Sequence, residues 1–552
     1  MEPAPARPLH GAAAVLLQRL RGIPWVTTAV FLCGLLPALG LTIVGWRSLM
    51  ENRPGGVTFA EGVKDVELRA AWLEFFRGGW VRATWLVLPA AVVAAVRLRG
   101  RALIFPVAVA SAHLALYWIG TDLIENLHRS FNDPLGMEPS PAAYTAKLML
   151  MATFALSPPL MLWLYYRATL LDRYLLRNFL PPFALCLGGI TAIMISMDLL
   201  NNLTDYTAAG YGPGQIIMYY VSQMPLILVS ITEAALLLAT LYSLGKMSRH
   251  NELSAMHSAG RSVLRVLLPL LVCGLWASAA VLAMNYQFAP DAQRIKEETR
   301  GTRRGSAGDT AVSNVLYRNR EALRTWYLHS VPYDLRPDNP MHDVYVWQQN
   351  AGGEILKGWF ARRAFWQPAN GVWQFQQVIE YTFADPLTGK PLKHPQRTSL
   401  PLMEQKRWPE TPGGMLSDKL DPDYLGVPGL LSVLKSRATL PDRIIAHYET
   451  ILHWRFALPL RCFLIVLLAA PLGIAASRRN VLGGVSAALG IFIFIFFMSH
   501  LLLTSGRGAY LPPFIAAWGV NLVFAAAGIL LLRYRSRNRL PLLFNPLRRT
   551  QP

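Results

Sequence analysis

Apolar residues in this sequence are gathered into long, uninterrupted blocks. Segments near residues 24–45, 456–476 and 481–503 each supply about 20 mainly apolar residues, the length an α-helix needs to cross roughly 30 Å of hydrocarbon. The same criterion predicts about ten membrane helices in total, the others lying near residues 80–96, 102–121, 148–166, 179–198, 216–242, 263–285 and 510–532. The pattern predicts an α-helical polytopic membrane protein and excludes a soluble enzyme.

The predicted helix at residues 80–96 has an alternative. It is short, and Arg82 lies close to its start, where the side chain can extend to the membrane interface. An interfacial helix fits this segment as well as a membrane-spanning one.

Residues 288–450 have a different pattern, in which apolar and polar residues alternate. The alternation is clearest in segments bounded by Pro, Gly, Asn and Asp, namely residues 325–331, 342–349, 354–366 and 371–384. A period of two is typical of β-strands with one buried face. Several such strands in series predict an inserted antiparallel β-domain, either a sandwich or an open, jelly-roll-like sheet.

The net charge of +20 is concentrated at the ends of the hydrophobic segments. Arg97, Arg99 and Arg101 lie between the second and third helices, and the C-terminal tail is rich in Arg, whereas residues 199–215 contain no Lys or Arg. By the positive-inside rule both termini are cytoplasmic and the β-domain lies outside the cytoplasm, which in a bacterium with two membranes means the periplasm. Charge in this arrangement sets topology, so no nucleic-acid partner is expected.

Four sequence segments lie at the ends of predicted helices and carry a family resemblance. They are LLDRYLLRNFLPPF at 170–183, LGKMSRHNELSAMHSAGRSVLRVLLP at 244–269, HWRFALPL at 453–460 and LPPFIAAWGVNLVF at 511–524. Together with the order of three helices, one β-rich insertion and three more helices, they resemble the LptF/LptG (YjgP/YjgQ) family of lipopolysaccharide-export permeases. The resemblance covers about residues 171–535.

The resemblance implies a membrane subunit of an ABC-type exporter in the bacterial inner membrane. Such a subunit extracts lipopolysaccharide or a related glycolipid and passes it to a periplasmic bridge, as part of outer-membrane biogenesis. The implied partners are a second permease chain of the same family, an LptB-type cytoplasmic ATPase and LptC/LptA-type periplasmic proteins. The chain contains no GxxxxGK[ST] phosphate loop, so ATP and Mg²⁺ are expected on the ATPase, and no catalytic residue, cofactor or metal is expected here.

The resemblance also divides the chain into segments. The N-terminal segment has no counterpart in the ordinary six-helix family member and is expected to be an accessory membrane module of about four helices. The F-like or G-like role stays open, because Asn201 and Asn202 stand where G-like members can carry lysines. The expected domains are 1–170 (accessory), 171–287 (first three permease helices), 288–450 (β-domain), 451–535 (last three helices) and 536–552 (basic tail).

The segment at 243–262 resembles the family's coupling helix. We expect Glu252 to accept charge-assisted hydrogen bonds from an Arg of the docked ATPase, with Leu253 and Met256, on one helical face, filling an apolar groove. Arg249 lies beside them. The alternative is a solvated loop in which Glu252 only neutralises its basic neighbours.

Arg455 and Arg461 begin the eighth helix and are candidate ligands for lipid phosphates. They are about 240° apart on the helix, so they do not share a face, and both could instead anchor the helix at the interface. Trp347 and Trp373 are candidates for an acyl-chain groove, and a closed β-domain core would use the same residues.

Glu233 lies inside a hydrophobic segment, where ionisable groups usually face a cavity or a partner. We expect a neutral or hydrogen-bonded interior side chain, and a role in proton coupling is the alternative. That alternative defines a second function, a proton-coupled secondary transporter. A third is an envelope scaffold or sensor, in which the extra N-terminal helices dock another protein.

Overall fold

The computed structural model describes most of the chain from residue 100 onward. The described residues are 100–132, 141–208, 210–303, 311–319, 321–332, 340–367, 371–384, 391–406, 408–416, 421–435, 441–475 and 481–536. The helices predicted near residues 24–45 and 80–96 lie outside them. Two compact units are present among the described residues, one of 100–131 with 148–169 and one of 141–147 with 170–536.

The first unit contains a short 3-10 helix, η1 (Gly100–Leu103), followed by α5 (Ile104–Asn132). The single helix predicted at 148–166 is instead a broken pair, α6 (Pro141–Ala155) and α7 (Ser157–Arg167), bent by 48°. Two consecutive prolines, Pro158 and Pro159, lack the backbone N–H groups that would continue the ladder, and they begin α7 instead.

The permease helices of the second unit are longer than the hydrophobic pattern predicts. The first group comprises α8 (Leu170–Ala208), α9 (Pro213–Arg249), the short α10 (Glu252–Ser258), α11 (Val263–Ala283), the π-helix η2 (Met284–Phe288) and α12 (Ala289–Arg303). The second group comprises α15 (Asp442–Ala475), α16 (Val481–Arg507) and α17 (Pro513–Ser536). Over the described residues seven helices are long and apolar enough to cross a membrane, or up to eight if the bent α6–α7 pair is one span.

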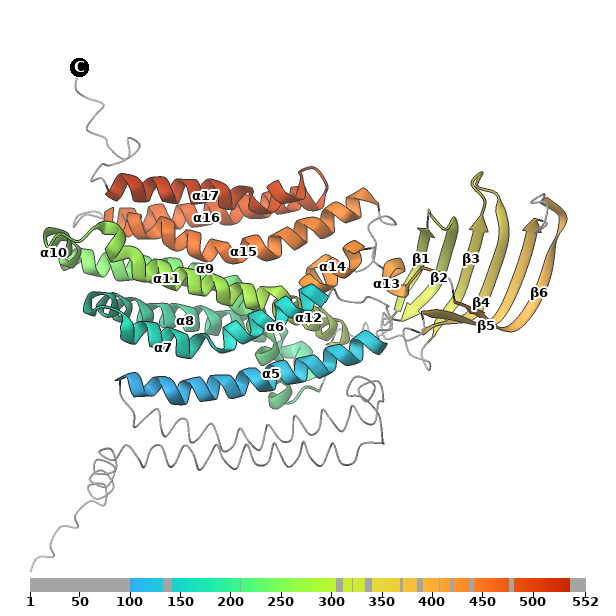
Figure 1. Cartoon of the computed structure of the whole chain (residues 1–552), viewed down its shortest axis with the longest axis horizontal. Coiled ribbons are helices and arrows are strands. Elements are labelled where there is room, and N and C mark those ends of the chain that lie inside the picture. The colour runs from blue at the N-terminus through green and yellow to red at the C-terminus, as the bar shows by residue number, and fades with distance from the viewer. Residues whose placement is uncertain are drawn as a thin grey trace, which may run out of the picture. The chain divides into compact units, whose positions relative to one another are not determined.

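Helix α15 is the centre of the helical core. It packs against α9, α11, α16 and α17, and α9, α11 and α15 lie side by side (Figure 1). Gly274 permits the close approach of α11, because a Cβ added there would lie 3.1 Å from Cγ2 of Val466. Small residues at helix crossings let membrane helices approach closely, and the close approach adds packing contacts.

The inserted β-domain is one six-stranded antiparallel sheet in which every strand pairs with its neighbours in sequence. The strands are β1 (Ala311–Asn319), β2 (Arg324–Pro332), β3 (Met341–Gln349), β4 (Ile355–Gln367), β5 (Val372–Ala384) and β6 (Pro391–Gln405). The four predicted strands are confirmed as β2 to β5. The order is a meander, which differs from the non-sequential pairing of a sandwich or jelly roll.

The two edge strands were not predicted from the alternation. Strand β6 contains Pro391, Pro395 and Pro401, which remove ladder donors, and most of its residues are exposed. Proline is tolerated at an edge strand because one side of that strand needs no hydrogen-bond partner. The sequence pattern of β6 is therefore that of a loop, and only its pairing with β5 makes it a strand.

A line of residues with positive φ interrupts the strand pairing across the sheet. Asn314, Asp343 and Gln377 have φ values of 58°, 52° and 55° and are missing from the strand register. Each directly precedes a member of one paired row across the sheet, which runs Val315, Leu328, Val344, Ala361 and Val378. The interruption crosses the sheet at one level and leaves the register unchanged on either side of it, and the sheet is visibly curved (Figure 1).

The contact at Gly274 gives a first prediction. Gly274→Val should lower the free energy of unfolding in detergent by about 1–3 kcal/mol, because the new methyl groups overpack the α11–α15 contact. Gly188→Val on α8 is the matched control, since a Cβ there meets nothing within 4 Å. Thermal unfolding of the two variants in one detergent measures the difference, and equal stability would contradict the packing role.

Candidate functional site

A buried ion pair joins α9 to α15. Arg461 Nε lies 3.0 Å from Glu233 Oε1, and the two side chains are 7% and 8% exposed. The Arg461 guanidinium also lies over the Trp454 ring, 4.8 Å from its centroid. The interior acid therefore has a cationic partner on a helix more than 200 residues away in sequence, which spacing arguments could not identify.

This pairing changes the interpretation of Arg461. The sequence analysis considered it for phosphate binding or interface anchoring, yet its guanidinium is buried against another helix. Two opposite charges inside a helix bundle stabilise each other where neither could be hydrated. The pair therefore selects one arrangement of α9 and α15.

The Arg455 side chain leaves α15 on a different face from the Arg461 side chain, as the helical spacing predicted. Its Nη2 donates to the backbone oxygens of Asp423 at 2.6 Å and Leu425 at 3.3 Å. Its Nη1 donates to Asn285 Oδ1 at 3.2 Å, and Asn285 Nδ2 donates back to the Arg455 backbone oxygen at 2.9 Å. Both Nη atoms are therefore used within the chain, and the Arg455 side chain is buried rather than exposed to a lipid phosphate.

The Arg455 contacts form part of a polar joint where the β-domain connects to α15. We define this joint as Asn285, Asp423, Leu425, Arg455 and Arg507. Arg507 at the end of α16 donates to Asp423 Oδ1 at 2.8 Å. The joint therefore holds η2, α15 and α16 against the segment of η3 (Pro422–Tyr424) and α14 (Val427–Lys435).

Two further features of this segment are its close contact with η2 at Gly426 and the acidic surroundings of Tyr424. A Cβ at Gly426 would overlap the Gln287 side chain, so a larger residue there would require that side chain of η2 to move. Burial, together with the carboxylates of Asp421, Glu297 and Asp423, raises the pKa of Tyr424 above its ordinary value. The phenol therefore stays protonated beside these acids.

The coupling segment is arranged differently from the expectation. Leu253 is buried and Met256 packs beside it, both against the core formed by the chain's own helices. They therefore do not present the apolar stripe to a partner. The exposed residues of the segment are mostly small or basic: Lys246, Arg249, His250, Asn251, Ser254, Ala255, His257, Ser258, Ala259, Gly260, Arg261 and Ser262.

The start of α8 makes two polar contacts that the sequence analysis did not predict, one with Glu252 of α10 and one with Arg265 of α11. Tyr174 donates its hydroxyl to Glu252 Oε2 at 2.8 Å. Arg265 Nη2 lies 2.9 Å from Asp172 Oδ2. The segment at 170–183, which contains Asp172 and Tyr174, carries part of the family resemblance. Its distance in sequence from Glu252 and Arg265 meant that the sequence alone could not predict either contact.

The two candidate tryptophans of the β-domain lie on opposite faces of the sheet. Trp373 is fully buried, and its Nε1 donates to the Glu410 backbone oxygen at 2.7 Å. Trp347 belongs to the other face, where its ring covers Gly358. The structure therefore does not bring these residues together in one groove.

The Trp373 face is closed by residues 408–416. Trp408 packs against the rings of Trp326, Trp359 and Phe375, with centroid distances of 5.2, 5.3 and 5.6 Å. Met415 and Leu416 complete the same cluster. This face is the core of the β-domain. Of the two roles considered for the aromatic residues, a closed core and an acyl-chain groove, the residues of this face form the core.

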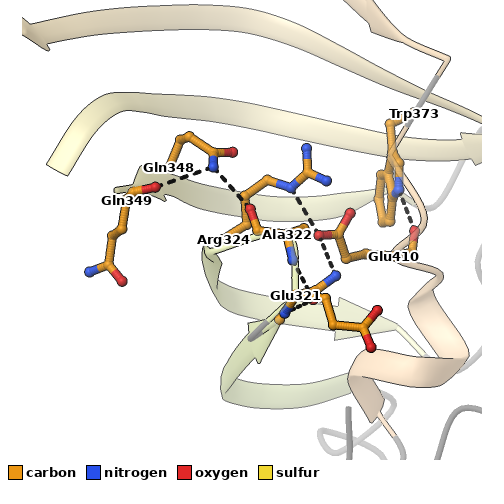
Figure 2. A network of polar contacts seen from close by, with 8 residues as sticks. Glu321, Ala322, Arg324, Gln348, Gln349, Trp373 and Glu410 are labelled. Atoms are coloured by element: carbon orange, nitrogen blue, oxygen red, sulfur yellow. Dashed lines mark hydrogen bonds and ion pairs between the residues drawn. The ribbon is translucent and has the colours of Figure 1, made fainter. Parts of the chain in front are cut away.

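A buried carboxylate anchors this closing segment (Figure 2). The Glu410 side chain is 0% exposed and lies 2.9 Å from Arg324 Nε, and Asn319 Nδ2 also donates to it at 2.9 Å. Arg324 in turn lies over the Trp408 ring, 4.8 Å from its centroid. The alternating pattern could not reveal Glu410, which lies outside the strands.

The part of the chain that the structure describes contains no group of three or more His, Cys, Asp or Glu placed to hold a metal ion. The site features are thus structural contacts between helices, a joint at the β-domain and an exposed basic segment. None is arranged as a nucleophile, base and oxyanion site.

Apolar helices on both sides of an inserted antiparallel sheet define a polytopic helical membrane protein with a β-domain. The chain belongs to the LptF/LptG family, because the family described as "Lipopolysaccharide export system permease LptF/LptG" matches residues 173–534. It is therefore a multi-pass inner-membrane protein and a non-catalytic permease subunit for lipopolysaccharide export. A comparison with curated proteins found no match.

The Glu233–Arg461 pair gives a second prediction. Arg461→Met should cost about 3–5 kcal/mol of stability, because it leaves the Glu233 carboxylate buried without its partner. Adding Glu233→Met should recover most of this loss, since two apolar side chains need no hydration. Thermal unfolding of both variants in detergent tests the pair, and a double variant as unstable as the single one would contradict it.

Proposed function

We propose that this chain is one half of the membrane part of an ABC-type exporter that extracts lipopolysaccharide or a related glycolipid and passes it to a periplasmic bridge. The observation that carries the proposal is the family match, which runs through both groups of permease helices and the β-domain between them. The proposed partners are a second LptF/LptG-type permease, an LptB-type ATPase that holds ATP and Mg²⁺, and LptC/LptA-type periplasmic proteins.

The proposed orientation places both termini and α10 in the cytoplasm and the β-domain in the periplasm. The distribution of arginine supports this orientation, because the C-terminal tail is rich in Arg, whereas residues 199–215 between α8 and α9 contain no Lys or Arg. Residues 1–170 form an accessory membrane module in this proposal. The separate unit of residues 100–131 with 148–169 supports that division, whereas residues 132 and 141–147 group with the permease helices.

The ATPase docks on the exposed surface of the coupling segment in this proposal. Small residues such as Ala255 and Gly260 allow close approach, and Arg249 and Arg261 supply positive charge at the two ends. Glu252 lies beside this surface with one oxygen bonded to Tyr174. Partner carboxylates would steer association with such a basic surface.

The β-domain receives the acyl chains on the sheet face that carries Trp347. Supporting this choice, Leu316 and Leu402 on that face are 69% and 50% exposed, whereas the Trp373 face is filled by residues 408–416. Apolar side chains on this face are accessible to an acyl chain, whereas those of the Trp373 face are already covered.

A secondary transporter that couples protons through Glu233 is less well supported. The carboxylate is already paired with Arg461 inside the bundle. A relay needs a group that exchanges protons with water, and both members of this pair are buried. The exporter is therefore the function we propose.

Purification of the chain from its own membrane tests the proposed function. We expect a second permease chain and an ATPase to copurify with it, and the reconstituted complex to hydrolyse ATP faster when lipopolysaccharide is present. A chain that purifies alone and transports in response to a proton gradient would contradict the proposal and support the secondary transporter.

Photo-crosslinking tests the route of the lipid. A crosslinking amino acid at position 347 should label the exported lipid during ATP hydrolysis, and the same amino acid at position 402 should label it as well, because both positions lie on the open face. Position 373 is the buried control. Labelling at 373 without labelling at 347 would contradict the assigned face.

A further inference from the structure

We propose that two side-chain contacts clamp the first permease helix, α8, to the coupling segment, and that this clamp transmits movement of the docked ATPase into α8. The contacts are Asp172 with Arg265 and Tyr174 with Glu252. The inference rests on the proposed function, since it needs an ATPase bound at α10. It assigns a positioning role to Asp172 and Tyr174 in lipid export.

Chain connectivity explains why α8 needs such contacts. Helix α10 is joined directly to α9 and α11 by short turns at residues 250–251 and 259–262, so both helices must follow when α10 moves. Helix α8 connects to α9 only at its opposite end, through residues 209–212. Near α10 no short chain connection joins α8 to the coupling segment, so side-chain contacts are what link the two.

Apolar packing holds α8 in place but does not fix its position along the neighbouring helices. Leu175 and Phe179 are buried in the core shared with α9 and α11. Such contacts are non-directional and tolerate small shifts. Hydrogen bonds lose strength quickly when their distance or angle changes, so the two polar contacts set the register of α8.

The Asp172–Arg265 contact joins α8 to α11. The atoms are 2.9 Å apart, and the Asp172 side chain is 11% exposed, so the pair is partly shielded from water. Arg265 lies in the first turn of α11, where its backbone N–H donates to the capping Ser262 at 3.3 Å. Asp172 is thereby attached to the point where the coupling segment becomes α11.

The Tyr174–Glu252 contact joins α8 to α10 itself. Glu252 is the first residue of α10, directly after Asn251, whose φ of 59° makes the sharp turn out of α9. Asp172 and Tyr174 are two residues apart, which places them about 200° apart around α8. The two contacts therefore hold α8 from different sides, one toward α10 and one toward α11.

The clamp predicts a loss of coupling with little loss of ATP hydrolysis. In the complete reconstituted complex, Tyr174→Phe combined with Asp172→Asn should keep ATP hydrolysis within about twofold of wild type and lower lipid released per ATP by about fivefold or more, the smallest usual allosteric coupling. Tyr242→Phe is the matched control, since this 61% exposed tyrosine near the same end of α9 also loses one hydroxyl.

A charge exchange separates positioning from simple stabilisation. Asp172→Arg alone should lower lipid released per ATP, and adding Arg265→Asp should restore part of it by remaking the pair in reverse. Unchanged lipid release per ATP in the Tyr174→Phe, Asp172→Asn variant would overturn the clamp. So would a parallel loss of ATP hydrolysis, lipid release and thermal stability, which indicates a purely structural role.

The same experiment distinguishes failure of the clamp from failure of the proposed function. Wild-type complex that hydrolyses ATP without releasing lipid would overturn the exporter proposal and the clamp with it. Wild-type complex that releases lipid, together with variants equal to wild type, would overturn the clamp alone.

Discussion

Every charge that enters the apolar bundle must find its partner inside the chain, and the helix arrangement depends on this constraint. Hydrocarbon offers no water to an exposed carboxylate or guanidinium, so an interior charge is tolerated when an opposite charge or several hydrogen bonds meet it. Glu233 and Arg461 meet this need across α9 and α15. Arg455 meets it with backbone oxygens and Asn285.

The same constraint places α15 between α9 and the joint at the β-domain. Its two arginines reach α9 on one side and the β-domain joint on the other, so displacement of α15 must disturb both. At the opposite end of the permease helices, the Asp172 and Tyr174 contacts attach α8 to α11 and α10. With polar contacts at both ends and close apolar packing between them, displacement of one helix is expected to displace the helices that it contacts.

The β-domain also contains a buried charged pair, which there helps to cover one face of the sheet. A single meander sheet buries neither face unless another segment covers it, and here residues 408–416 cover the tryptophan-rich face. The buried Glu410 is stabilised by Arg324 and Asn319 and holds that segment closed (Figure 2). The opposite face, with Trp347 and Leu316, stays partly exposed.

The sequence by itself determined the membrane class, the permease helices, four of the strands and the family, because these depend on local periodicity and on contiguous motifs. It could not show β6, whose prolines hide a strand that exists only through pairing with β5. The tertiary structure alone decided that Arg461 meets Glu233, that Tyr174 meets Glu252, and that Trp347 and Trp373 lie on opposite faces. Each of these contacts joins residues distant in sequence, and hydrophobic pattern reports which residues are buried but not which neighbour they meet.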